Sequence, residues 1–297
     1  MALNRDAIGK EYSGFEWDVT KERIMDYTRA YGDDNPAFLE NYDDKGIVAP
    51  PMFAVVFQLE PVMTPLFDQD VGVNMMKLVH GEQAMKFHKL VRPGDKVLSK
   101  CVILGMEEKS SGELLELEVT STDQQGEILV VSNGVMFIRG KKKKDKSEVA
   151  EEKAGKKDLK AWEEKEAGFT GGLLLERTIV TDKDQPDRYS QASGDMNPIH
   201  LDDDFARSVG LPGRIMHGLC TMAICQKVLI DGMCDRDPAR LKSFKVRFSG
   251  MVVPGEGITT RVWKVEEKSG EMAVGLDART SEDNYVITKA DAVISTG

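Results

Sequence analysis

Histidine and paired cysteine are scarce in this chain. Four histidines occur among 297 residues, and the four cysteines form no C-x-x-C pair. Zinc clusters and disulfide frameworks need closely spaced ligands or paired cysteines, so the sequence predicts neither a metal site nor disulfides. We expect free thiols in a reducing compartment at Cys101, Cys220, Cys225 and Cys234.

Long apolar runs are also missing. The longest uncharged apolar stretches, such as residues 49–59, have about half of the ~20 residues that a membrane span needs. The N-terminal MALNRDAIGK contains no apolar signal-peptide region, and the C-terminal STG is not an SKL-type peroxisomal address. We therefore expect a cytoplasmic protein with no membrane partner.

The chain lacks an excess of basic residues. Its formal net charge is −10 and its pI is about 5.1, which disfavours nucleic acid as a partner because phosphate neutralisation needs a basic surface. Hydrophobic residues make up 41% and charged residues 30%, a globular composition with enough apolar material for two domains.

What the sequence does contain is an internal repeat. The segment DYTRAYGDDNPAFLENYDDKGIVAP begins at Asp26, and RYSQASGDMNPIHLDDDFARSVGLP begins at Arg188. Residues 162 positions apart match, namely Tyr27 with Tyr189, Gly32-Asp33 with Gly194-Asp195, Asn35-Pro36 with Asn197-Pro198, and Pro50 with Pro212. Further on, VRPG from Val91 matches VVPG from Val252. One architecture is therefore used twice.

A charged segment separates the two copies. Residues 141–166 contain ten Lys and eight Asp or Glu among 26 residues, and such a segment cannot bury enough apolar surface to form a core. The sequence thus predicts an N-terminal domain at 1–139, a linker at 140–170 and a C-terminal domain at 171–297.

Each half has the same predicted elements. A short strand (14–18 or 173–180) precedes a helix capped by Thr20 or Thr181. A G-D-x-N-P turn follows, then an apolar helix at 51–63 or 218–230, and then strands with period-2 alternation. In the second half these strands are at 242–250, 258–268, 271–281 and 285–295. The pattern predicts an α+β fold in which an antiparallel sheet wraps around an apolar helix.

The turn of the second half carries candidate catalytic groups. Gly194 permits an unusual backbone angle, and Pro198 keeps Asn197 out of the α region. This fixed turn lets Asp195 and His200 converge on a small molecule such as water. The alternative is an Asx-type turn with a capping Asp and a stray His.

A second candidate is the start of the apolar helix, at Met216-His217-Gly218. The N-terminus of a helix presents unpaired N–H groups, and Gly218 allows a substrate oxygen to approach them closely. The Gly218 amide is thus a candidate oxyanion donor. The His217 side chain is either a substrate-binding group or a packing or capping residue.

The run RYSQASGDMNPIHLD followed by GLPGRIMHG resembles the MaoC-like, or hydratase 2, family of hot-dog-fold enzymes. The resemblance implies (R)-specific hydration of trans-2-enoyl-CoA, or the reverse dehydration. It implies Asp195 and His200 as the catalytic pair, Asn197 as a supporting amide and Gly218 as the donor to the thioester carbonyl. It also implies two hot-dog domains paired as a pseudo-dimer, with the first half as a non-catalytic partner.

The first half departs from the family pattern. It has Phe38 where the second half has His200, and we align Pro51-Met52-Phe53 with Met216-His217-Gly218. A Phe transfers no proton, so this copy is predicted to be inactive and to shape an acyl pocket. The candidates for the wall of that acyl pocket are Phe53, Val56, Phe57 and Leu59.

An acyl-CoA substrate is anionic, so basic residues are expected to edge the cleft. The substrate-binding candidates are Arg214, His217, Lys245 and Arg247, with Arg188 and Lys242 as further basic residues. No cofactor is expected, since coenzyme A enters as part of the substrate. An acyl-CoA thioesterase and a non-catalytic acyl-thioester-binding protein remain alternatives, and a homo-oligomer of the pseudo-dimer is left open.

Overall fold

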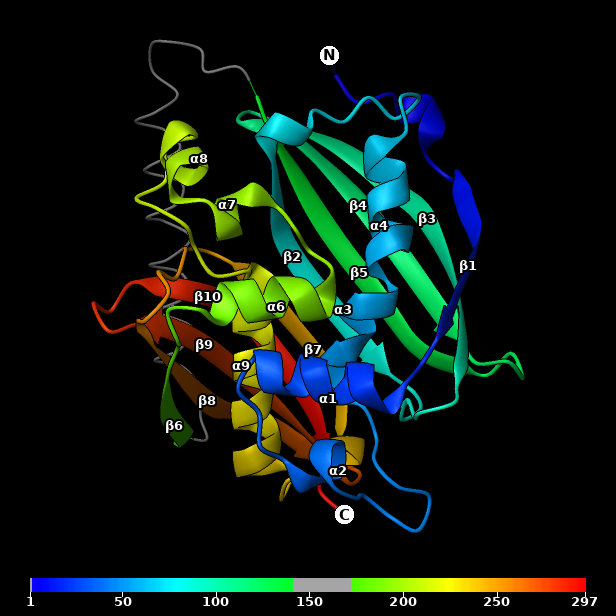
Figure 1. The fold of residues 1–297 in the computed structure, drawn as a ribbon, viewed down its shortest axis with the longest axis vertical. Helices are drawn as coiled ribbons and strands as arrows, with labels where there is room; N and C mark the ends of the chain where they lie inside the picture. Colours follow the sequence, from blue (N-terminus) through cyan, green and yellow to red (C-terminus); the bar gives the residue numbers. More distant parts are fainter. Residues whose placement is uncertain (1, 141–171) are drawn as a thin grey trace.

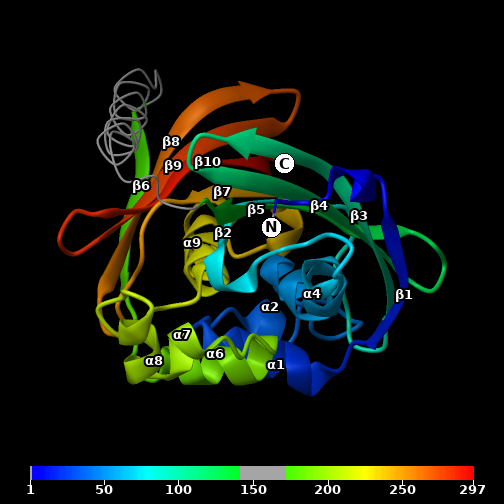
Figure 2. The ribbon, with the colours of Figure 1, turned by 90° about the horizontal axis from the view of Figure 1, so that it is seen from above.

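The computed structural model describes residues 2–140 and 172–297, so the predicted linker lies outside the described residues except for Gly140. Strands from both halves form one antiparallel sheet of ten strands, in the order β1-β3-β4-β5-β2-β7-β10-β9-β8-β6. The helices lie against one face of this sheet, which curves over them (Figures 1 and 2). The predicted α+β architecture is confirmed.

The first half contains four helices, five strands and three short 3-10 helices. They are η1 (Arg5–Ala7), β1 (Glu11–Asp18), α1 (Lys21–Ala30), α2 (Pro36–Leu39), η2 (Pro51–Phe53), α3 (Ala54–Phe57), α4 (Leu59–Phe67), η3 (Met75–Lys77), β2 (Leu78–Phe87), β3 (Lys96–Lys109), β4 (Gly112–Thr122) and β5 (Ile128–Arg139).

The second half repeats this plan in the part of the chain from residue 172 onward. Its elements are β6 (Leu173–Val180), α6 (Gln185–Ser193), α7 (Pro198–Leu201), α8 (Asp203–Ser208), α9 (Gly218–Met233), η4 (Pro238–Arg240), β7 (Leu241–Phe248), β8 (Gly257–Lys268), β9 (Glu271–Thr280) and β10 (Tyr285–Ser295). The strands predicted for this half are all present, within one or two residues of the expected bounds.

The two halves are related by a pseudo-twofold axis. Their sheets join where β2 pairs with β7, with Gln83 opposite Val246 and Met85 opposite Phe244. A shift of 161 residues converts each of these pairs into the other and converts the pair Ala84–Lys245 into itself. In the helix layer, the hydroxyls of Tyr27 and Tyr189 lie 3.4 Å apart. The sequence repeat is therefore a structural pseudo-dimer, with α1 and α6 side by side at its axis (Figure 2).

The central helices of the two halves differ. In the second half α9 is continuous and is buried on all sides from Cys220 to Ile230, as expected of a helix that is apolar around its circumference. The single helix predicted at 51–63 is instead divided into η2, α3 and α4, with a break at Gln58. Pro61 accounts for the break, because it has no N–H to donate to the carbonyl of Phe57.

One predicted cap is also wrong. Thr20 caps α1 by accepting a hydrogen bond from the Arg23 N–H, but α6 begins four residues after Thr181 and has no side-chain cap. Pro186 fixes the start of α6, because proline is favoured in the first turn of a helix. Thr181 instead donates to the carbonyl of Glu256.

Contacts between the halves are polar as well as apolar. The Met52 N–H donates a 2.7 Å hydrogen bond to Gln226 Oε1 in α9, and Leu59 approaches Gly194 closely. Phe53 and Phe57 are buried in the same apolar cluster as most of α9. Within the described residues, no helix is both long and apolar enough to cross a membrane.

We predict that the second half does not behave as an independent monomer. The fragment Gly171–Gly297 leaves the β7 edge and the face around Tyr189 uncovered, so it is expected to self-pair or to precipitate. Co-expression with the fragment Met1–Arg139 is expected to restore a soluble one-to-one complex, measured by size-exclusion chromatography with light scattering. A soluble, monomeric C-terminal fragment contradicts this prediction.

Candidate active site

The turn that follows α6 depends on glycine. Gly194 has a φ of +83°, and its N–H donates to the carbonyl of Ser190 to close the helix. A Cβ at this position would lie 3.0 Å from Leu59 Cδ2 of the first half. Both the left-handed backbone and the close approach of Leu59 therefore disfavour a larger residue here.

Asp195 and Asn197 build the next part of the turn. Asp195 Oδ1 accepts the Asn197 N–H at 3.1 Å, and Asn197 Oδ1 accepts the Ile199 N–H at 3.3 Å. The first bond is the Asx-type turn considered from the sequence, and the second makes Asn197 the N-cap of α7. Asn197 thus positions the short helix that carries His200.

His200 is buried and is held in one tautomer. Its Nδ1 lies 2.9 Å from the carbonyl oxygen of Ile215. Because a carbonyl only accepts, Nδ1 carries the proton and Nε2 keeps its lone pair. Burial lowers the pKa of His200, so the ring is neutral at physiological pH and its Nε2 is a proton acceptor.

His217 lies against His200. The two rings stack with centroids 3.8 Å apart and an interplanar angle of 29°. His217 Nε2 is 3.2 Å from the main-chain carbonyl of Asp195 and 3.1 Å from Ser190 Oγ. Burial and the neighbouring His200 lower the pKa of His217 to about 4. With only 1% of its surface exposed, His217 fits a role in positioning Asp195 better than direct contact with substrate.

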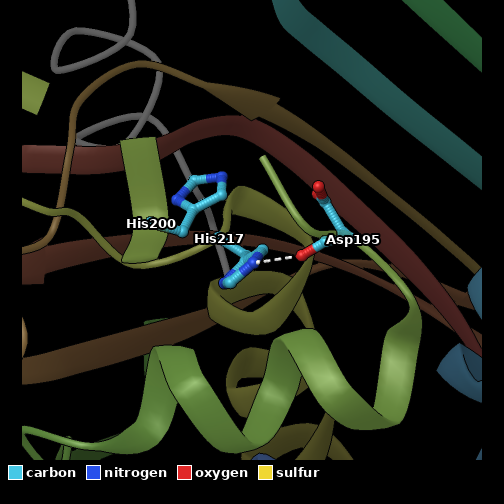
Figure 3. A group of neighbouring side chains, drawn as sticks. All are labelled: Asp195, His200 and His217. Atoms are coloured by element: carbon cyan, nitrogen blue, oxygen red, sulfur yellow. Dashed lines mark hydrogen bonds between the residues drawn. The ribbon is translucent and has the colours of Figure 1, made fainter. Parts of the chain in front are cut away.

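Three side chains thus form one cluster at the start of α9 (Figure 3). One ligand atom from each of Asp195, His200 and His217 lies within 4.8 Å of the others. Two histidines and a carboxylate also suit a transition metal. Nearly parallel stacked rings, however, do not direct their in-plane lone pairs to one point, so this geometry suits proton transfer better than chelation.

Gly218 adds a hydrogen-bond donor beside this cluster. It is exposed, it is the first residue of the 16-residue helix α9, and its N–H makes no hydrogen bond among the described residues. A Cβ here would lie 3.2 Å from the ring of Phe248. Gly218 therefore leaves open, at the positive end of the helix, a place for an oxygen that gains negative charge.

The basic candidates are dispersed. Arg214 directly precedes Ile215, whose carbonyl contacts His200, but the Arg214 guanidinium is bound to the Asp187 carboxylate at 2.9 and 3.0 Å. Phe244 and Val246 of β7 are buried beneath the sheet, so Lys245 and Arg247 lie on the opposite face, since side chains alternate along a strand. The structure thus directs the Arg214 guanidinium to the start of α6, and it places Lys245 and Arg247 on the other face of the sheet.

The first half has lost more of this site than its sequence indicated. Main-chain bonds from Ala49 to Val91 and from Val48 to Ala37 reproduce those from Met216 to Val252 and from Ile215 to Ile199. Pro50 and Pro51 therefore stand where His217 and Gly218 stand.

The sequence alignments of residues 51–53 with 216–218 and of Pro50 with Pro212 are accordingly wrong. The connection that carries α8 in the second half is longer, which shifts the register by five residues. Since proline has no N–H, the first half has no donor equivalent to Gly218. Phe38, fully buried, occupies the place of His200 as predicted.

The remaining aspartate of the first half has acquired a structural role. Asp33 is buried, accepts the Tyr31 hydroxyl at 2.8 Å and lies 3.4 Å from Lys227 Nζ of α9. Lys227 also pairs with Asp34 at 2.6 Å and Asp231 at 2.8 Å. Burial raises the pKa of Asp33, although Lys227 opposes the shift. Asp33 thus helps to neutralise a buried lysine between the halves.

Sequence reasoning missed Ser190, the Ile215 carbonyl and Phe248. Ser190 lies one turn before Gly194 in α6, so a helical projection could have indicated it. The contacts of Ile215 with His200 and of Phe248 with Gly218 join distant segments of the chain. No local sequence pattern predicts such contacts.

Comparison with known proteins agrees with this architecture. Residues 167–286 match the family model described as "MaoC like domain", and residues 6–131 match "FAS1-like, dehydratase domain region". A relative from Dictyostelium discoideum named "Probable enoyl-CoA hydratase 2" is 26% identical over 297 residues, covering 98% of this chain and 96% of the relative. "Enoyl-CoA hydratase 2, peroxisomal" from Arabidopsis thaliana is 29% identical over 228 residues, covering 72% and 68%.

Among solved structures, a MaoC-like dehydratase from Phytophthora capsici superposes with a TM-score of 0.76 at 23% identity, covering 99% of this chain and 98% of that one. Residues 167–286 therefore belong to the MaoC-like family, and the chain as a whole has the double hot-dog fold.

The histidine pair predicts how stability depends on pH. The unfolded chain protonates these rings near pH ~6.5, whereas the folded chain holds the pKa of both below that value. The contribution of these neutral rings to the free energy of unfolding is therefore fully present above pH ~6.5. It is lost as the pH drops toward 4. For His217 the loss between pH 7 and 5 is about 2 kcal/mol.

Urea unfolding at the two pH values measures this loss. His217→Gln keeps an N–H donor for the Asp195 carbonyl but cannot titrate, so its loss on acidification should be smaller than that of the wild type by about 1–2 kcal/mol. His88→Gln, at an exposed position, is the matched control and should behave as the wild type. Equal losses in the wild type and His217→Gln contradict the prediction.

Proposed function

We propose that this chain catalyses the (R)-specific addition of water to trans-2-enoyl-CoA, giving the (3R)-hydroxyacyl-CoA, or the reverse dehydration. The observation that carries the proposal is the cluster of Asp195, His200 and His217 within 4.8 Å, beside the Gly218 N–H, which has no partner among the described residues. Relatives named enoyl-CoA hydratase 2 support it.

In the proposed mechanism one water molecule lies between Asp195 and His200. The carboxylate and the lone pair on His200 Nε2 are both acceptors, so the water donates one hydrogen to each and presents its own lone pair to C3. As the C3–O bond forms, one water proton passes to Asp195 or His200. The π electrons move toward the thioester oxygen, and a proton from this pair then reaches C2.

Gly218 stabilises the charge that develops meanwhile. Its N–H is positioned to donate to the thioester carbonyl, which becomes enolate-like in the transition state, and the dipole of α9 adds to the effect. Every step is a proton transfer or an addition. We therefore propose no cofactor, with coenzyme A as part of the substrate.

The first half is proposed as a non-catalytic partner that completes the acyl pocket. Formation of larger homo-oligomers and a cytoplasmic location stay predictions, and the Arabidopsis relative is named as peroxisomal.

An assay with crotonyl-CoA tests the proposed reaction. We expect absorbance at the enoyl-thioester band to fall without thiol release, and chiral analysis to show the 3R product. Thiol release would instead identify a thioesterase, no change would indicate an acyl-thioester-binding protein, and the 3S isomer would reject the stereochemical assignment.

Substitution of the catalytic pair tests the mechanism. Asp195→Asn and His200→Ala are each expected to lower kcat/KM roughly 10²–10⁴-fold, because each removes a proton acceptor. The Asn side chain still accepts the Asn197 N–H, so the turn should persist. Circular dichroism and Tm check the fold, and near wild-type turnover in both variants would refute the assigned roles.

Asp33→Asn is the matched control, because Asp33 occupies the same turn in the inactive half. Turnover is expected to stay within a few-fold of the wild type. The free energy of unfolding should fall by about 1–3 kcal/mol, since Lys227 loses one of its three carboxylate partners. A loss of turnover like that of Asp195→Asn would show that the first site is catalytic.

A further inference from the structure

A second polar cluster lies on the inner face of the sheet, in the first half. The register between β2 and β5 shifts between His80, opposite Met136, and Glu82, opposite Val135, which leaves Gly81 as a bulge. Because of this extra residue His80 and Gln83, three positions apart, both point to the inner face, whereas regular alternation would place them on opposite faces.

The two side chains converge above a glycine. A Cβ on Gly134 of β5 would lie 3.6 Å from Gln83 Oε1, 3.8 Å from His80 Nε2 and 3.3 Å from the end of Met136. Ser132 follows the same face of β5 two residues away. We call this group, His80, Gln83, Ser132 and Gly134, the Gly134 subsite.

Its polar atoms are incompletely paired. His80 Nε2 and Ser132 Oγ are both buried and have no hydrogen-bond partner among the described residues. The Gln83 amide makes one long bond, 3.5 Å, to the carbonyl of Ala84. Buried polar atoms without partners are rare because each costs free energy, so they indicate a place where a ligand group completes the bonding.

The subsite is connected to the active site. The ring of His80 meets Phe248 edge-on, with centroids 5.1 Å apart, and Phe248 packs on Gly218. Burial lowers the pKa of His80 to about 4, although the Glu82 main chain, the Gln83 side chain and the Asp195 carboxylate all favour its protonation. A neutral His80 therefore lies between Phe248, which packs on Gly218, and Gly134 of the first half, and its buried Nε2 has no hydrogen-bond partner among the described residues.

We propose that the Gly134 subsite binds a hydroxyl group on the acyl chain of the substrate, beyond the reacting C2–C3 bond, with His80 as the main specificity determinant. This rests on the proposed function and adds the class of substrate. A hydroxyl both donates and accepts, so it can satisfy His80 together with Gln83 or Ser132.

The pseudo-twofold axis supports a role tied to the active half. The shift of 161 residues that relates β2 to β7 places Leu241 where His80 stands, and Leu241 is buried in the apolar core. An aliphatic residue therefore suffices at this position of the fold, so packing alone does not require a histidine. The histidine occurs at the one of the two symmetric positions that contacts Phe248, next to the candidate active site.

Steady-state hydration by the full-length protein tests the proposal. The substrates are trans-2-decenoyl-CoA and a set of trans-2-decenoyl-CoAs that carry one hydroxyl at successive positions from C5 onward. We expect the wild type to favour at least one hydroxylated isomer about tenfold in kcat/KM over the plain chain. His80→Leu, the residue of the symmetric position, should reduce that ratio to about one.

A second variant and a control make the outcome decisive. Gly134→Ala, on a strand with no unusual φ, places a methyl group 3.6 Å from Gln83 Oε1 and 3.8 Å from His80 Nε2, so it should obstruct the subsite and also abolish the preference. His88→Leu removes an exposed histidine just after the same strand and should keep it.

Three results would overturn the inference. Plain and hydroxylated chains hydrated equally by the wild type would overturn it while the proposed function stands, and so would a preference that survives in both His80→Leu and Gly134→Ala. No hydration of any substrate would overturn the proposed function and this inference together.

Discussion

The pairing of β2 with β7 is the contact on which the rest of this molecule depends. It converts two five-stranded sheets into one and fixes the pseudo-twofold axis through Ala84 and Lys245. Once the axis is set, α4 of the first half must approach the turn after α6, and Leu59 meets Gly194. The candidate active site is therefore closed on one side by the first half, whose own turn has Phe38 and Pro51 in place of His200 and Gly218.

The two halves show how one architecture supports opposite outcomes. At the start of its central helix the second half has His217 and Gly218, whereas the first has two prolines. Proline removes the N–H donor and fixes the backbone, so the oxyanion position is lost together with the histidine. The aspartate that remains in the first half is buried against Lys227, and removing either partner would leave a buried charge uncompensated.

Burial also determines the chemistry of the second half. Two stacked histidines kept neutral by desolvation are a cost to stability at low pH, but they leave the lone pair on His200 Nε2 available at neutral pH. The same desolvation acts on His80, across the boundary between the halves. The proposed proton transfer and the proposed selection of substrate thus both use imidazoles that burial keeps neutral.

The sequence by itself determined the duplication, the α+β class and the strands, because repeats and period-2 alternation are local properties of the chain. It also indicated Asp195, His200 and Gly218 as neighbours, since a fixed turn and a helix start are short-range features. Only the tertiary structure decided the true register of Pro50 and Pro51, the burial of Asp33 against Lys227 and the approach of His80 to Phe248. These depend on packing between segments far apart in the chain, on the length of the connection carrying α8 and on a bulge at Gly81, none of which leaves a periodic signal in the sequence.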